Sequence, residues 1–173
     1  MDRSRLAILL MFVVACGLGL VSVGYHTWAS HGVLAWWGGD MARLIADAPR
    51  VEALRLRPAD ESKKTPAGAA SADMLLVTGK AYVVVQRKDV TAALGLDHLR
   101  RGLLDDGNFV WPAKAEPAAV RWSDALVFSD TTRRLVVVFD FVDHRIGRTD
   151  GATTLEIDQI ARGWQDFFAA ELP

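Results

Sequence analysis

The chain has 173 residues, of which 51% are hydrophobic and 24% are charged, and its formal net charge is −1. This length and composition predict one globular domain behind an apolar leader and exclude a disordered chain. Proteins that neutralise phosphates usually carry a clear basic excess, so nucleic acid is excluded as the expected partner. Cys16 is the single cysteine, which excludes an internal disulfide and a cysteine-based zinc site.

The first predicted element is an apolar helix. Residues 6–25 carry no charge, and at roughly 1.5 Å per residue they would span about 30 Å, the thickness of a hydrocarbon core. Arg3 and Arg5 precede this segment, which favours a cytoplasmic N-terminus and an extracytoplasmic domain. The aromatic residues expected at the far membrane interface are Tyr25, Trp28, Trp36 and Trp37.

Two other fates of this leader stay open. Val13-Val14-Ala15-Cys16 resembles the bacterial lipobox, so Cys16 is a candidate for lipidation behind a short apolar segment. The apolar run GLGLVSVGY follows, where lipoproteins usually continue with a polar tether. The third alternative is cleavage after Ala29. All three alternatives predict that the main domain is periplasmic. The chain is expected to divide into an anchor or signal segment at 1–29, a membrane-proximal helical region at 30–49 and an α+β domain at 50–173.

The next elements alternate between helix and strand. Asp40 is expected to cap a helix with apolar residues at i, i+3, i+4 and i+7, and Pro49 to end it. Residues 51–57 predict a strand with Leu54 and Leu56 on one face. Residues 58–73 lack an apolar period and predict a flexible surface loop. Residues 74–77 and 81–86 predict either one bulged strand or a hairpin, with AYVVV as a central strand.

The rest of the chain predicts helices and an antiparallel sheet. A helix capped by Asp97 is expected to end near Gly107, in a left-handed conformation. Trp122, Leu126 and Phe128 are expected on one face of a strand that pairs with 135–142 across a turn at 130–133. A further turn is expected at Asp150-Gly151, and Asp158 is expected to cap a final helix whose apolar stripe is Ile160, Ala161, Trp164, Phe167, Phe168 and Leu172. The fold class is α+β, with an N-terminal hydrophobic helix and a small antiparallel sheet packed against two or three helices.

Asp140, Asp143 and His144 in FDFVDHR form the most suggestive polar group. Along a straight strand the first and last would stand roughly 13 Å apart, so a turn would be needed to join them. The simpler interpretation is a paired structural carboxylate, and the alternative is a metal or acid-base site. The sequence lacks the common nucleophile, phosphate-loop, dinucleotide and zinc motifs, so neither catalysis nor a cofactor or metal is expected.

The layout of residues 51–57 and 81–172 resembles small bacterial lipoproteins and membrane-anchored domains of unknown function. The residues that carry it are the strand VEALRLR, the pair LVFSDTTRRLVVVFDF and the closing helix IARGWQDFFAAEL. The resemblance implies a fold and a compartment, and carries no functional residue across.

The resulting expectation is a membrane-anchored extracytoplasmic domain that binds membrane lipid and an envelope or membrane protein, as a non-catalytic accessory subunit. A small enzyme or metal-dependent binder using Asp140, Asp143 and His144 is the alternative. A purely structural brace of the envelope is a third reading.

Overall fold

The computed structural model describes Met11, Gly17 and residues 31–59, 73–115, 120–151 and 153–173. These form an α+β domain whose eight-stranded antiparallel sheet has the order β2-β3-β1-β5-β6-β7-β8-β4. The strands are β1 (Arg50–Pro58), β2 (Met74–Val77), β3 (Lys80–Asp89), β4 (Val110–Ala115), β5 (Asp124–Ser129), β6 (Arg134–Asp140), β7 (Arg145–Arg148) and β8 (Thr153–Glu156). The helices are α2 (His31–Trp37), α3 (Gly39–Asp47), α4 (Leu96–Gly102) and α5 (Asp158–Glu171), with a 3₁₀ turn η1 (Asp106–Asn108).

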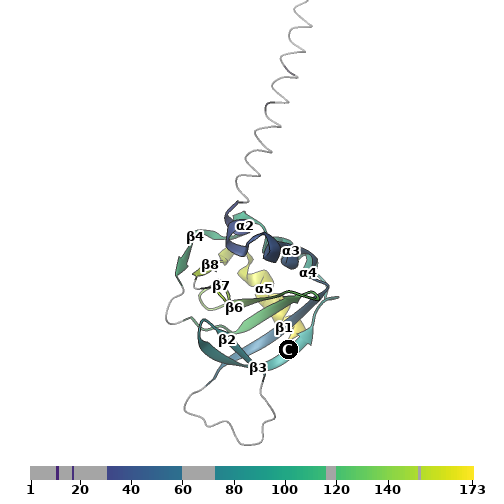
Figure 1. Cartoon of the computed structure of the whole chain (residues 1–173), viewed down its shortest axis with the longest axis vertical. Coiled ribbons are helices and arrows are strands. Elements are labelled where there is room, and N and C mark those ends of the chain that lie inside the picture. The colour runs from purple at the N-terminus through teal and green to yellow at the C-terminus, as the bar shows by residue number, and fades with distance from the viewer. Residues whose placement is uncertain (1–10, 12–16, 18–30, 60–72, 116–119, 152) are drawn as a thin grey trace, which may run out of the picture.

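The sheet curls into a half-barrel (Figure 1). The backbone N–H of Thr78, between β2 and β3, donates to the carbonyl of Thr149, after β7, at 3.5 Å. These two turns lie far apart in the strand order, so their contact requires strong curvature and coiling of the sheet.

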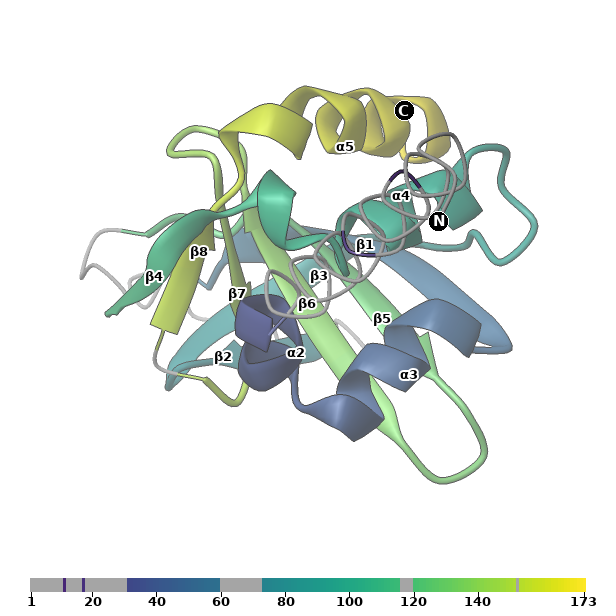
Figure 2. The ribbon, with the colours of Figure 1, turned by 90° about the horizontal axis from the view of Figure 1, so that it is seen from above.

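The helices cover one face of the sheet. Alternate residues of the central strands, such as Leu126, Phe128, Val137 and Phe139, point into the core that the helices share with the sheet. Phe139 meets Trp164 of α5 with ring centroids 5.2 Å apart. Figure 2 shows the four helices grouped over the strands. We call this the helix-side core.

The strand residues that alternate with those of the helix-side core point to the opposite face of the sheet and form a second core. Its members are Leu54, Leu56, Val77, Tyr82, Val120, Trp122, Ala125, Val127, Val136 and Val138. A Cβ built on Gly147 would lie 2.8 Å from the Trp122 ring, so the indole packs directly on the backbone of β7. The central strands are therefore buried on both faces.

Several sequence predictions are confirmed. Leu54 and Leu56 share a face, and residues 74–77 and 80–89 form a hairpin rather than one strand. β5 pairs antiparallel with β6 across a turn at Asp130 to Arg133. The final helix buries Ala161, Trp164, Phe167 and Phe168.

Other predictions are wrong in detail. Trp122 precedes β5 and packs in the second core, while Leu126 and Phe128 lie in the helix-side core, because the strand begins only at Asp124. The cap position of α4 is Gly95, with a φ of 87°, and Asp97 lies inside the helix. Gly107 lies in η1 with an ordinary φ.

The final helix, the hairpin and the sheet also differ from prediction. Ile157 takes the cap position of α5, with Asp158 in its first turn. β3 lies next to the end of the sheet, so AYVVV is not a fully buried central strand. The sheet is larger than predicted, and four helices rather than two or three are present in the described residues.

The two N-terminal helices of the described chain belong to the same core. Val33 and Trp37 of α2, and Leu44 and Ile45 of α3, are buried in the helix-side core. Residues 31–47 are therefore an integral part of the α+β domain. No helix in the described part of the chain combines the length and the apolar character needed to cross a membrane.

Candidate functional site

Asp140 lies at the end of β6 and is 1% exposed. Its Oδ1 accepts the backbone N–H groups of Val142 and Asp143 at 2.9 and 3.2 Å, and its Oδ2 accepts that of Arg121 at 3.1 Å. The carboxylate therefore closes the turn after β6 and holds the segment that precedes β5. A carboxylate engaged in this way is a structural group.

His144 faces a different partner. Its Nδ1 lies 2.9 Å from Oδ1 of Asp158, at the start of α5, and both side chains are exposed. The Asp143 side chain is also exposed. The turn after β6 brings the backbones of 140, 143 and 144 together, but their side chains do not converge on a common point. Among the described residues no group of three or more His, Cys, Asp or Glu side chains could hold a metal ion.

The predicted membrane-interface residues separate into two sets. Cys16, Tyr25 and Trp28 lie outside the described residues. Trp37 is 1% exposed and its indole N–H donates to the carbonyl of Leu103 at 2.8 Å, so it is a core residue of the domain. Trp36 is half-buried, and its indole N–H donates to Thr153 Oγ1 at 3.0 Å.

The start of α2 is fixed to the rest of the domain. The backbone N–H groups of Gly32 and Val33 donate to the Asp106 carboxylate at 3.2 and 2.5 Å. A carboxylate at this position also interacts favourably with the positive end of a helix. The Trp111 ring lies 3.0 Å from where a Cβ of Gly32 would stand, so the indole covers the first turn.

The end of α2 is held by a second ionic group. Arg148 donates through Nη1 to the carbonyls of Trp36 and Trp37 at 2.8 and 3.4 Å. Its Nη2 pairs with Asp150 at 2.7 Å. The hydrogen bond between them raises the pKa of Arg148 and lowers that of Asp150. Both ends of α2 are therefore bound to elements distant in sequence, and we call these contacts the α2 junction.

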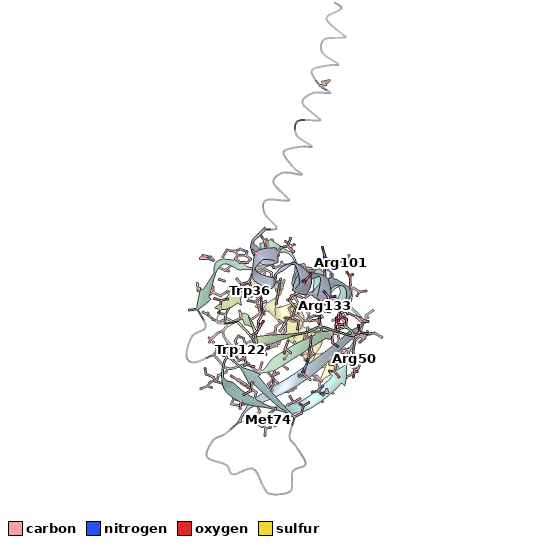
Figure 3. All side chains as sticks on the ribbon, viewed as in Figure 1. Trp36, Arg50, Met74, Arg101, Trp122 and Arg133 are labelled. Atoms are coloured by element: carbon pink, nitrogen blue, oxygen red, sulfur yellow. The ribbon has the colours of Figure 1, made fainter. Side chains whose placement is uncertain are left out.

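Exposed apolar side chains gather on the hairpin at the far end of the domain. Met74 and Leu76 of β2 are 55% and 66% exposed, and Val85 of β3 is also exposed. Met74 pairs with Val83 and Leu76 with Ala81, so Met74 and Leu76 share the face opposite to the second core. Figure 3 shows Met74 at the end of the domain away from Trp36. We call this set the β2–β3 outer face.

A cavity of about 450 Å³ lies between α4, η1 and α5. His98 and Arg101 line it on one side and Ile160 and Trp164 on the other. Two of its polar lining residues make local hydrogen bonds, since Asp105 Oδ1 accepts the N–H of Gly107 and Asn108 Nδ2 donates to the carbonyl of Gly102. These contacts stabilise the turn after α4.

Sequence reasoning missed the residues of the α2 junction. Asp106, Trp111 and Arg148 lie far from α2 in the chain, and no local spacing connects them to it. The β2–β3 outer face had a weak signal, because MLLV followed by AYVVV leaves apolar residues on both faces of a hairpin.

No family model, curated protein or solved structure matches this chain. The resemblance in layout to small bacterial lipoproteins and membrane-anchored domains stays a prediction.

Proposed function

We propose that this protein is a membrane-tethered, periplasmic, non-catalytic domain that binds another envelope protein. The partner supplies an extended segment that lies along β2. The observation that carries the proposal is the β2–β3 outer face, where Met74 and Leu76 are exposed on a strand at the end of the sheet.

The edge position of β2 favours strand addition. Among the described residues, β3 is the only strand paired with β2. An exposed apolar edge strand presents unpaired backbone groups and is a risk for aggregation unless something covers it. An added strand would pair with this backbone, and its alternate side chains would pack against Met74 and Leu76.

The chain itself offers poor cover for this face. Residues 60–72, which join β1 to β2, contain no large apolar side chain. The exposed Arg57 lies beside the patch, opposite Val83 in the register. A partner segment with alternating apolar residues and a flanking carboxylate would fit this surface best.

Two features support the tether: the uncharged segment at 6–25, and the position of α2 at one end of the domain (Figure 1). The α2 helix lies at one end of the domain (Figure 1), and Met74, at the start of β2, lies at the other end (Figure 3). A partner site far from the tether remains accessible to other proteins. The contacts of Asp140, Asp143 and His144 favour a structural role, so we advance no enzymatic function.

The test is photo-cross-linking in native membranes. A photoreactive amino acid replaces Leu76 in the full chain, and a matched chain carries it at the exposed Val142, in the turn between β6 and β7. We expect one reproducible adduct with a different protein from position 76 only. Met74→Lys should abolish this adduct, while Leu94→Lys, at an exposed loop residue, should leave it intact.

If the adduct at position 76 contains a second copy of the chain, the β2–β3 outer face mediates self-association, and the proposal of a different partner protein is wrong. Equal adducts from both positions, or none from position 76, would contradict the proposal.

A further inference from the structure

We infer that the domain stands on the membrane that anchors it, with its α2 end against the lipid headgroups and with Leu34, Val110 and Trp111 in contact with them. This orientation rests on the retained-helix form of the proposed function. It adds a defined lipid-contact surface and a fixed direction for the partner site.

The link between anchor and domain is short. If residues 6–25 span the bilayer, only residues 26–30 lie between the span and His31. Fully extended, the path from Tyr25 to His31 covers about 20 Å, and as a helix about 9 Å. The headgroup layer on one side of a bilayer is itself roughly 5 to 8 Å thick. As a helix this path places the start of α2 at the outer edge of the headgroup layer, and fully extended it places it at most about 15 Å beyond that layer.

The domain cannot swing freely about α2. Asp106 holds the first turn of the helix, and Arg148 holds its last two carbonyls. Trp37 is buried in the helix-side core with its indole N–H bonded to Leu103. The direction of α2 relative to the rest of the domain is therefore fixed by these contacts.

The surface around this point carries apolar side chains. Leu34 on α2 is 42% exposed, and Val110 and Trp111 at the start of β4 are 43% and 36% exposed. The Trp111 ring lies on the first turn of α2, and its indole N–H donates to the carbonyl of Asp106 at 3.2 Å. Tryptophan is the side chain most typical of the interface between lipid and water. These residues fit a headgroup layer better than bulk water.

The orientation also explains the place of the β2–β3 outer face. Because Met74 lies at the opposite end from α2, a domain standing on its α2 end presents this face to the periplasm (Figures 1 and 3). A partner would then approach without competition from the bilayer.

The test uses the full chain in vesicles of phosphatidylethanolamine and phosphatidylglycerol. Leu34→Cys and Val110→Cys are labelled with a thiol-reactive, environment-sensitive fluorophore, and Leu76→Cys and Val142→Cys serve as controls at other exposed sites. The unsubstituted chain gives the background from Cys16. Quenching by lipids with a nitroxide on the headgroup reports contact, and flotation reports membrane attachment.

We expect quenching at positions 34 and 110 to be several-fold stronger than at 76 and 142, in chains that float with the vesicles. A chain that floats but shows equal quenching at all four positions overturns this orientation and leaves the tether intact. A chain that does not float overturns both the tether and the orientation.

Discussion

At the scale of single residues, the Asp140 carboxylate holds the turn after β6 and the segment before β5. Three backbone N–H groups, from Arg121, Val142 and Asp143, depend on this one buried carboxylate. Removing it would leave donors without acceptors in a half-buried turn.

We expect Asp140→Ala to lower the free energy of unfolding by about 2 kcal/mol, because hydrogen bonds to a charged group are lost. Asp143→Ala, at an exposed neighbour, should change it by less than about 0.5 kcal/mol. Urea unfolding of both variants measures the difference. Equal stabilities would remove the structural role assigned to Asp140.

We expect the stability of the fold to depend on pH through Asp130, in the turn between β5 and β6. Its carboxylate accepts the backbone N–H groups of Thr132 and Arg133 and the guanidinium of Arg133, which together lower the pKa below its ordinary value of 3.8. A lowered pKa stabilises the fold above the ordinary value, and this contribution is lost as the pH falls below about 4. The stability difference between wild type and Asp130→Asn should therefore shrink below that pH. Unfolding curves at several pH values measure it, and a constant difference would contradict the assignment.

Gly147 is required by the close approach of Trp122. A Cβ at this position would lie 2.8 Å from the indole, whereas one at Gly151 would lie 3.5 Å from its nearest neighbour. Gly147→Ala should cost about 2 kcal/mol through overpacking, and Gly151→Ala less than about 0.5 kcal/mol. Thermal unfolding compares the two. If both variants melt alike, Trp122 is not held against β7 as described.

At the scale of elements, α2 owes its position to groups far away in the sequence. Arg148→Gln removes the charged donor to the carbonyls of Trp36 and Trp37. We expect amide hydrogen exchange in α2 to become about ten-fold faster, as for the loss of one hydrogen bond from a charged group. Arg134→Gln, at an exposed arginine of β6, should leave this rate unchanged. Unchanged exchange in Arg148→Gln would show that α2 is held by packing alone.

The elements that the sequence predicts are those with long apolar patterns. The pair of β5 and β6 and the stripe of α5 have such patterns, so their existence and type follow from spacing. β4, β7 and β8 were not predicted. Segments such as Arg145-Ile146-Gly147-Arg148 carry a single large apolar residue, and their pairing with neighbours decides that they are strands.

Helix starts were also predicted poorly, for a local reason. Asp97 and Asp158 favour a cap position, but the backbone turns one or two residues earlier, at Gly95 and Ile157. The acidic residues then lie in the first helical turn, where a negative charge is still favourable. Sequence therefore indicates the region of the cap and not the residue.

At the scale of the whole molecule, the curl of the sheet gives the domain two different ends. The contact between the turns at Thr78 and Thr149 depends on the register of many strands, and no sequence pattern predicts it. The α2 junction and the β2–β3 outer face are consequences of this arrangement. Of the candidate residues, sequence indicated Trp36 and Asp140, but it could not reveal which side chains are buried.

The membrane tether is tested by the intact mass of the protein extracted from its native membrane, beside a Cys16→Ser variant. If the domain is tethered, we expect either the mass of the uncleaved chain in both, or the mass of a chain beginning at acylated Cys16 that is lost in the variant. A mass corresponding to an unmodified chain that begins at Ser30 would contradict the tether, because the domain would then be released from the membrane.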